Sequence, residues 1–157
     1  MDAINEIIRH NSWATAHLVE HVQSMPPETL DLSAPGTFGP IGPTLAHILS
    51  AERAYMTRLK GGTPVPRPRD SKVDMAELAD QARSLGEEWE HLLQAGINAD
   101  LEVQTRQGPQ MAGTLLVQVV NHATEHRAHV CTVLGTHGIE PPALDAFTYR
   151  AAVREGL

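Results

Sequence analysis

Four long stretches of the sequence repeat apolar residues with a period near 3.6, and prolines and glycines separate them. Each stretch predicts an amphipathic helix with one apolar stripe. The predicted helices span residues 3–25, 42–59, 74–95 and 113–136. In a chain of this kind the stripes are buried most simply against one another, so the pattern predicts an all-α fold built as a four-helix bundle.

Two smaller elements are expected beside the bundle. Apolar and polar residues alternate over residues 101–105 before Gly108 and Pro109, which predicts a small hairpin between the third and fourth helices. A proline pair at 141–142 precedes a short C-terminal helix expected over residues 143–154. The order of the helices around the bundle does not follow from these patterns.

Composition narrows the class of protein. The chain has 157 residues, of which 41% are apolar, so we expect residues 1–157 to form a single domain. Its net charge of −7 and the lack of a Lys/Arg run argue against nucleic-acid binding. No apolar run reaches the roughly 18 residues of a membrane span, and the N-terminus lacks a signal-peptide pattern. We therefore expect a cytoplasmic protein that does not bind membranes.

Histidine is the unusual component, because the chain contains nine. His122 and His126 are four residues apart on the apolar side of the fourth predicted helix, a spacing that lets two imidazoles bind one ion. His47 lies at the edge of the apolar stripe of the second helix. Each feature alone is also compatible with histidines satisfied by water or backbone. Together, three imidazoles with open positions beside them are typical of a catalytic metal site, since structural zinc normally takes four protein ligands.

Several motifs are similar, in order and spacing, to those of the DinB/YfiT-like superfamily of metalloenzymes. The resemblance covers nearly the whole chain. The matching motifs are residues 10–14 (HNSWA), 44–49 (TLAHIL) followed by Glu52-Arg53, Asn121-His122 through His126-Arg127, and a closing segment with Gly135 and residues 141–145 (PPALD) ending near Tyr149.

The resemblance implies that His47, His122 and His126 bind a divalent metal ion inside a four-helix bundle. Zinc and nickel suit three imidazoles, and iron, copper or manganese are further candidates. It also implies a small-molecule substrate and a low-molecular-weight thiol as cofactor, because some members transfer such thiols or use one in an isomerisation. Members of the family often form homodimers, so a homodimer is expected.

Two further residues of the fourth helix are candidates for catalysis. His129 stands where the family frequently has glutamine, and it lies on the same side of the helix as His122. It is an alternative ligand, a proton shuttle or a hydrogen-bond partner of a ligand, and we favour the last two roles. Glu125 precedes a predicted ligand and is either a base acting through water or part of a solvated surface, the second being the simpler interpretation.

The functional hypotheses belong to different classes. The first is a divalent-metal-dependent enzyme with an S-transferase-like use of a thiol, and the same site would also suit a metal-dependent hydrolase. The second is a non-catalytic metal-binding stress-response bundle. A helical interaction module without a metal is the third.

Charged and polar residues on the apolar sides make separate predictions. Glu52 and Arg127 fall within apolar stripes, so we expect a buried ion pair between the second and fourth helices. Asn11 is expected to form a hydrogen bond inside the bundle. A further histidine stripe on the first helix, with an HxxxH spacing at residues 17–21, borders the apolar arc from outside and is interpreted as a surface feature.

Overall fold

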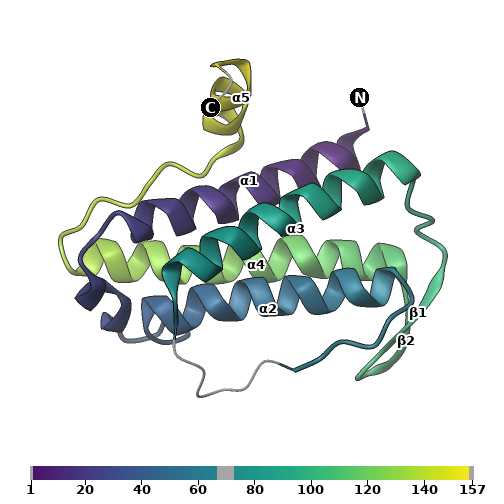
Figure 1. The fold of residues 1–157 in the computed structure, drawn as a ribbon, viewed down its shortest axis with the longest axis horizontal. Helices are drawn as coiled ribbons and strands as arrows, with labels where there is room; N and C mark the ends of the chain where they lie inside the picture. The colour runs from purple at the N-terminus through teal and green to yellow at the C-terminus, as the bar shows by residue number, and fades with distance from the viewer. Residues whose placement is uncertain (1, 67–72, 156–157) are drawn as a thin grey trace.

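The computed structural model describes residues 2–66 and 73–155 of the chain. Four long helices lie side by side, with a hairpin at one end and a short helix outside the bundle (Figure 1). The predicted all-α bundle, the hairpin and the C-terminal helix are therefore confirmed. The elements are α1 (Ala3–Gln23), η1 (Pro27–Asp31), α2 (Ile41–Leu59), α3 (Met75–Ala95), β1 (Glu102–Thr105), β2 (Gly108–Met111), α4 (Ala112–Thr136) and α5 (Ala146–Glu155).

Local capping explains where the helices begin and end. The side chain of Asp74 accepts hydrogen bonds from the first turn of α3, and Gly96 follows the helix with a φ of 83° that favours glycine. Asp145 accepts in the same way from the backbone of Phe147 and Thr148, so α5 begins at Ala146 rather than at the predicted residue 143.

The loop between α1 and α2 is more ordered than the sequence indicated. α1 ends at Gln23, two residues before its predicted limit, and the proline that follows opens the 3₁₀ helix η1 instead of a plain loop. α2 then begins at Ile41 and tolerates Pro43 in its first turn, where a missing N–H leaves no helical hydrogen bond unmade.

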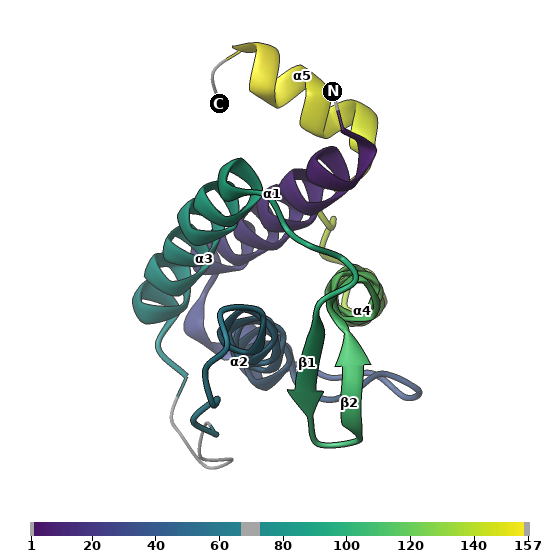
Figure 2. The same cartoon turned by 90° about the vertical axis from the view of Figure 1, so that its right-hand side faces the viewer.

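Each helix of the bundle has two main neighbours. α1 packs against α3 and α4, while α2 packs against α4 and α3, and the view along the bundle shows this arrangement (Figure 2). One continuous core joins all four helices, and its largest fully buried side chains include Trp89, Ile8, Leu18, Ile41, Leu45, Ile48, Leu49, Met56, Leu78 and Leu134. The α2–α4 contact matters for function because these two helices carry the predicted metal ligands.

The hairpin lies beside α2 and α4 (Figure 2). Its strands are antiparallel, with Thr105 opposite Gly108 across a two-residue turn. The Thr105 hydroxyl donates to the Gly108 carbonyl at 2.7 Å, and Val103 is buried in the core. The hairpin thus contacts the bundle through both strands, β1 against α2 and β2 against α4.

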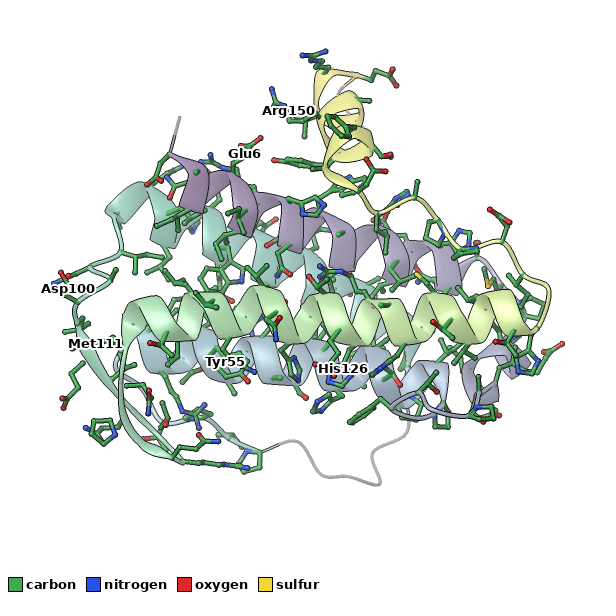
Figure 3. The ribbon with its side chains drawn as sticks, turned by 180° about the vertical axis from the view of Figure 1, so that it is seen from behind. Glu6, Tyr55, Asp100, Met111, His126 and Arg150 are labelled. Carbon is green, nitrogen blue, oxygen red and sulfur yellow. The ribbon has the colours of Figure 1, made fainter. Side chains whose placement is uncertain are left out.

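The histidine stripe of α1 contacts the C-terminal part of the same chain. His10 and His21 each donate a ring N–H to a backbone carbonyl, of Leu144 at 2.8 Å and of Glu140 at 3.1 Å. Nearer the N-terminus of α1, the side chains of Glu6 and Arg150 form an ion pair (Figure 3). The stripe is therefore a surface feature, as expected, that residues 140–150 partly cover.

Glu52 and Arg127 are both buried, at 3% and 5% exposure, but the predicted ion pair between them is wrong. The two side chains, both in the described part of the chain, form no direct salt bridge. Glu52 instead accepts a hydrogen bond from Trp89 Nε1 on α3 at 2.6 Å. Burial raises the pKa of Glu52, whereas the Trp89 hydrogen bond and the charge of Arg127 act in the opposite direction.

Arg127 finds its partners on α1. Its guanidinium donates to Asn11 Oδ1 at 2.9 Å and to Thr15 Oγ1 at 2.8 Å, which confirms that Asn11 forms a hydrogen bond inside the bundle. Burial lowers the pKa of Arg127 to about 10, so the side chain is still charged near neutral pH. The two buried side chains thus link α2 to α3 and α4 to α1, and hold the ligand-bearing helices against the rest of the bundle.

Within the described ranges, no helix combines the length and the apolarity needed to cross a bilayer.

Candidate metal centre

Three histidines from α2 and α4 meet between the two helices. His47, His122 and His126, referred to below as the triad, each present one ring nitrogen, and these nitrogens lie within 4.8 Å of one another. The ring centroids are separated by 4.4 to 4.9 Å in every pair. In the described part of the chain, no other group of His, Cys, Asp and Glu side chains comes together in this way.

The helical geometry explains this convergence. His122 and His126 are one turn apart on α4, so both imidazoles project from the same face. That face turns toward α2, where His47 occupies the facing position, and His126 lies at the seam between the two helices (Figure 3). The Nε2 atoms of His47 and His122 are 3.0 Å apart and share a hydrogen bond.

Partial burial keeps the triad neutral. The pKa of His122 is lowered to about 4, chiefly by loss of solvent and in smaller part by the neighbouring His126 and His47. Burial is also the largest cause of the lowered pKa values of His47 and His126. Three uncharged imidazoles therefore face one another near neutral pH, and neutral imidazole is the form that binds a metal ion.

The residues fit a divalent ion. Imidazole nitrogens that share one ion at about 2.1 Å lie roughly 3 to 4 Å apart, so the triad needs only small side-chain rotations to close on one. Nδ1 of His126 is buried and has no hydrogen-bond partner in the described part of the structure. A buried polar atom without a partner is costly, and such atoms occur where a ligand or ion completes the site.

Aromatic side chains border the triad. The ring of Phe38 stacks on His47 at 4.5 Å between centroids and meets the edge of His126 at the same distance. Tyr55 approaches His122 edge-on, and Figure 3 shows it at the same seam between α2 and α4. Phe38 was missed by the sequence analysis because it lies in the loop before α2, where no periodicity indicates a neighbour.

A cleft of about 1160 Å³ opens beside the triad. His47, Phe38 and Tyr55 line it, together with the β1–β2 turn and the beginning of α4. A small molecule in this cleft would thus reach one side of the triad. The three imidazoles supply no fourth protein donor, which leaves coordination positions for such a molecule.

Comparison with known proteins identifies the family. The family model described as "DinB family" matches residues 1–155. The chain belongs to the DinB family. The resemblance noted from the sequence motifs is therefore confirmed.

A solved structure supports the fold of this DinB-family chain. It is a DinB-like protein from Bacillus cereus ATCC 10987, with a TM-score of 0.65 and 17% sequence identity. The match covers 85% of this chain and 90% of that protein, so the whole bundle is shared rather than one helix pair. A search of curated proteins finds no match.

His129 and Glu125, the two candidate catalytic residues of this DinB-family chain, lie outside the triad. The His129 ring is 5.5 Å from that of His126 between centroids, and its Nδ1 is buried without a partner in the described structure. Glu125 is exposed on α4, as expected for a solvated surface residue. Neither residue lines the cleft, so a role for either in proton transfer remains a prediction.

The low pKa of His122 predicts how the metal-free DinB-family protein responds to acid. Between pH 6.5 and about 4 the unfolded chain protonates this imidazole and the folded chain does not. The unfolded state therefore binds more protons, and the free energy of unfolding falls as the pH falls through this window. Urea unfolding at pH 6.5 and 5 in the presence of a chelator measures the effect. We expect a smaller loss in His122→Asn than in the wild type, and equal losses would contradict the assignment.

Proposed function

We propose that this protein is a divalent-metal-dependent enzyme that uses a low-molecular-weight thiol in an S-transferase-like reaction. The observation that carries the proposal is the triad itself, three neutral imidazoles that meet beside a cleft, which His47 lines. Zinc or nickel suits this donor set, and iron, copper or manganese remain candidates. The thiol is the part of the proposal that rests on the family resemblance alone.

The chain's own residues would hold and shield the reacting groups. His47, His122 and His126 would hold the ion, which when bound lowers the pKa of a thiol or water at an open position. Phe38 covers the triad on one side and limits the access of bulk water from there. The cleft provides the space in which a substrate meets the thiol.

In the proposed reaction the thiol sulfur attacks an electrophilic carbon. The thiol proton goes to solvent, a carbon–sulfur bond forms, and the bond from that carbon to its leaving group breaks. The leaving group departs with the bonding electron pair. No external oxidant or reductant is needed, since the electrons balance within the exchange.

Conjugation of monochlorobimane with mercaptohexanoate tests the proposal, with chloride as the leaving group and fluorescence as the signal. Lowering a thiol pKa by about 2 units raises its thiolate fraction about a hundredfold near neutral pH, and the weaker nucleophile reduces this gain about tenfold. We therefore expect the zinc-loaded protein to react about tenfold faster than His47→Ala. Equal rates for the two proteins would contradict the proposal.

A non-catalytic role for the ion, as a tether between α2 and α4, is the second candidate. Chelation separates the two ideas, because a structural ion contributes directly to the folding free energy. Here Glu52 and Arg127 already bind α2 and α4 to the other helices, and the core is continuous without the triad. This arrangement favours a preformed site, so removing the ion should abolish activity while circular dichroism still reports the folded bundle.

A metal-dependent hydrolase is a further alternative for the same site. Such an enzyme would turn over its substrate without an added thiol.

A further inference from the structure

The cleft beside the triad extends far along α2. His47, Ala51, Ala54 and Arg58 follow spacings of four, three and four residues, so they lie on one face of this helix. All four line the cleft. Because the alanine side chains are small, they leave space in the cleft between the histidine at one end and the arginine at the other.

The arginine at the far end points back toward the triad. Arg58 donates from Nη1 to the carbonyl of Ala54 at 3.0 Å, so its guanidinium folds back along α2 in the direction of His47. From Ala54 to His47 the rise along α2 is about 10 Å, at 1.5 Å per residue. Arg58 and His47, the triad residue that lines the cleft, therefore stand at the two ends of a molecule-sized span.

The charge of the cleft differs from that of the chain. The whole protein carries a net charge of −7. Among the described residues that line the cleft there are two arginines, Arg58 and Arg106, and no aspartate or glutamate. Arg106 comes from the β1–β2 turn, on the side of the cleft across from α2. Gln107, Gln110 and Gln118 also line the cleft.

We propose that this cleft binds an elongated anionic small molecule, whose carboxylate or phosphate contacts Arg58 while its other end reaches the triad. Arginine suits this role because its planar guanidinium binds oxyanions through two parallel hydrogen bonds. Arg106 adds a second positive charge from the hairpin. The identity of the reactive end as a thiol rests on the proposed function, whereas the anion site rests on the cleft alone.

The anion site is tested first on the metal-free protein. Mercaptohexanoate and mercaptohexanol have the same chain length and differ in one charged group. Nuclear magnetic resonance of the arginine side chains should show the Nε–H signal of Arg58 shifting with mercaptohexanoate and not with mercaptohexanol. Arg83 serves as the internal control, because it is an exposed residue of α3 that pairs with Asp80. If the Arg58 Nε–H signal does not shift with mercaptohexanoate, or shifts equally with both thiols, the proposal is overturned.

The link between the two ends is tested on the cobalt-loaded protein, where a cobalt–thiolate absorption band reports binding of the sulfur. We expect mercaptohexanoate to bind about tenfold more tightly than mercaptohexanol, as one charge-assisted contact predicts. The preference should disappear in Arg58→Gln and persist in Arg83→Gln.

The two measurements fail independently. Equal affinity of the two thiols for the cobalt-loaded protein, or a preference kept by Arg58→Gln, overturns the proposal that one molecule spans Arg58 and the triad, and leaves the proposed thiol chemistry in place. If Arg58 responds to the carboxylate but neither thiol gives a band, the anion site is supported and the thiol chemistry is contradicted.

Discussion

Replacing Arg127 by alanine is expected to lower the free energy of unfolding by about 3–5 kcal/mol. The change leaves Asn11 Oδ1 and Thr15 Oγ1 in the bundle without their donor. It also removes the positive charge that lowers the pKa of the buried Glu52. A cavity adds to the loss, because Arg127 is only 5% exposed and its side chain fills space inside the bundle.

Urea unfolding of three variants separates these causes. Arg127→Met keeps most of the volume but donates no hydrogen bond, so its loss should lie between those of the wild type and of Arg127→Ala. Arg83→Ala is the control, with an expected change below about 0.5 kcal/mol, because Arg83 is exposed and its ion pair is solvated. Arg127→Ala should also bind zinc more weakly, since His126 is the adjacent residue on α4. A stability loss no larger than that of Arg83→Ala would show that Arg127 does not hold α4 against α1.

The sequence predicted the bundle well because each helix carries its own evidence. A stripe with a period near 3.6 needs no knowledge of its partner, and the HxxxH pair of α4 shares a face whatever packs against it. The placement of His47 at the edge of a stripe likewise favoured a position near a neighbouring helix. The triad could therefore be proposed from His47, His122 and His126 before their distances were known.

Partners across helices could not be predicted in the same way. Glu52 and Arg127 were correctly expected to be buried, yet their partners come from α3 and α1, and the order of helices around the bundle decides that choice. A stripe shows which face is buried without showing what faces it. The pairing of two opposite charges was the simplest assumption. In the structure Trp89 is the partner of Glu52, and Asn11 is a partner of Arg127.

Loop and hairpin contributions to the site were also out of reach. Phe38 borders the triad from a segment with no helical period, and Arg106 reaches the cleft only because the hairpin lies beside α2 and α4. Aromatic and charged residues in such segments are usually solvated, so their residue types alone do not indicate a site. Arg58 had the right spacing from His47, but the small residues between them were not interpreted as the floor of a cleft.

Removing one imidazole of the triad is expected to lower the zinc affinity at least about a hundredfold, because it removes one of three protein ligands. His126→Ala is the most informative variant, since His126 is the triad member with a buried ring nitrogen that has no partner in the described structure. Its bundle should remain folded, because the alanine lies at the seam and the apolar core continues past it. Isothermal titration with zinc at neutral pH measures the affinity, and circular dichroism confirms the fold.

His129→Ala is the matched control for this experiment. His129 lies one turn from His126 on the same helix but outside the group of converging nitrogens. Its replacement should leave the zinc affinity within about threefold of the wild-type value. A large loss in His129→Ala would instead make His129 a ligand, the alternative that the sequence left open.

The zinc content of the purified protein after reconstitution and removal of excess metal tests the three-histidine site most directly. The triad predicts about one zinc ion per chain in the wild type and in His129→Ala, and almost none in folded His47→Ala, His122→Ala and His126→Ala. Full zinc content in any one of the three triad variants, or no bound zinc in the wild type, would contradict a metal site built from these histidines.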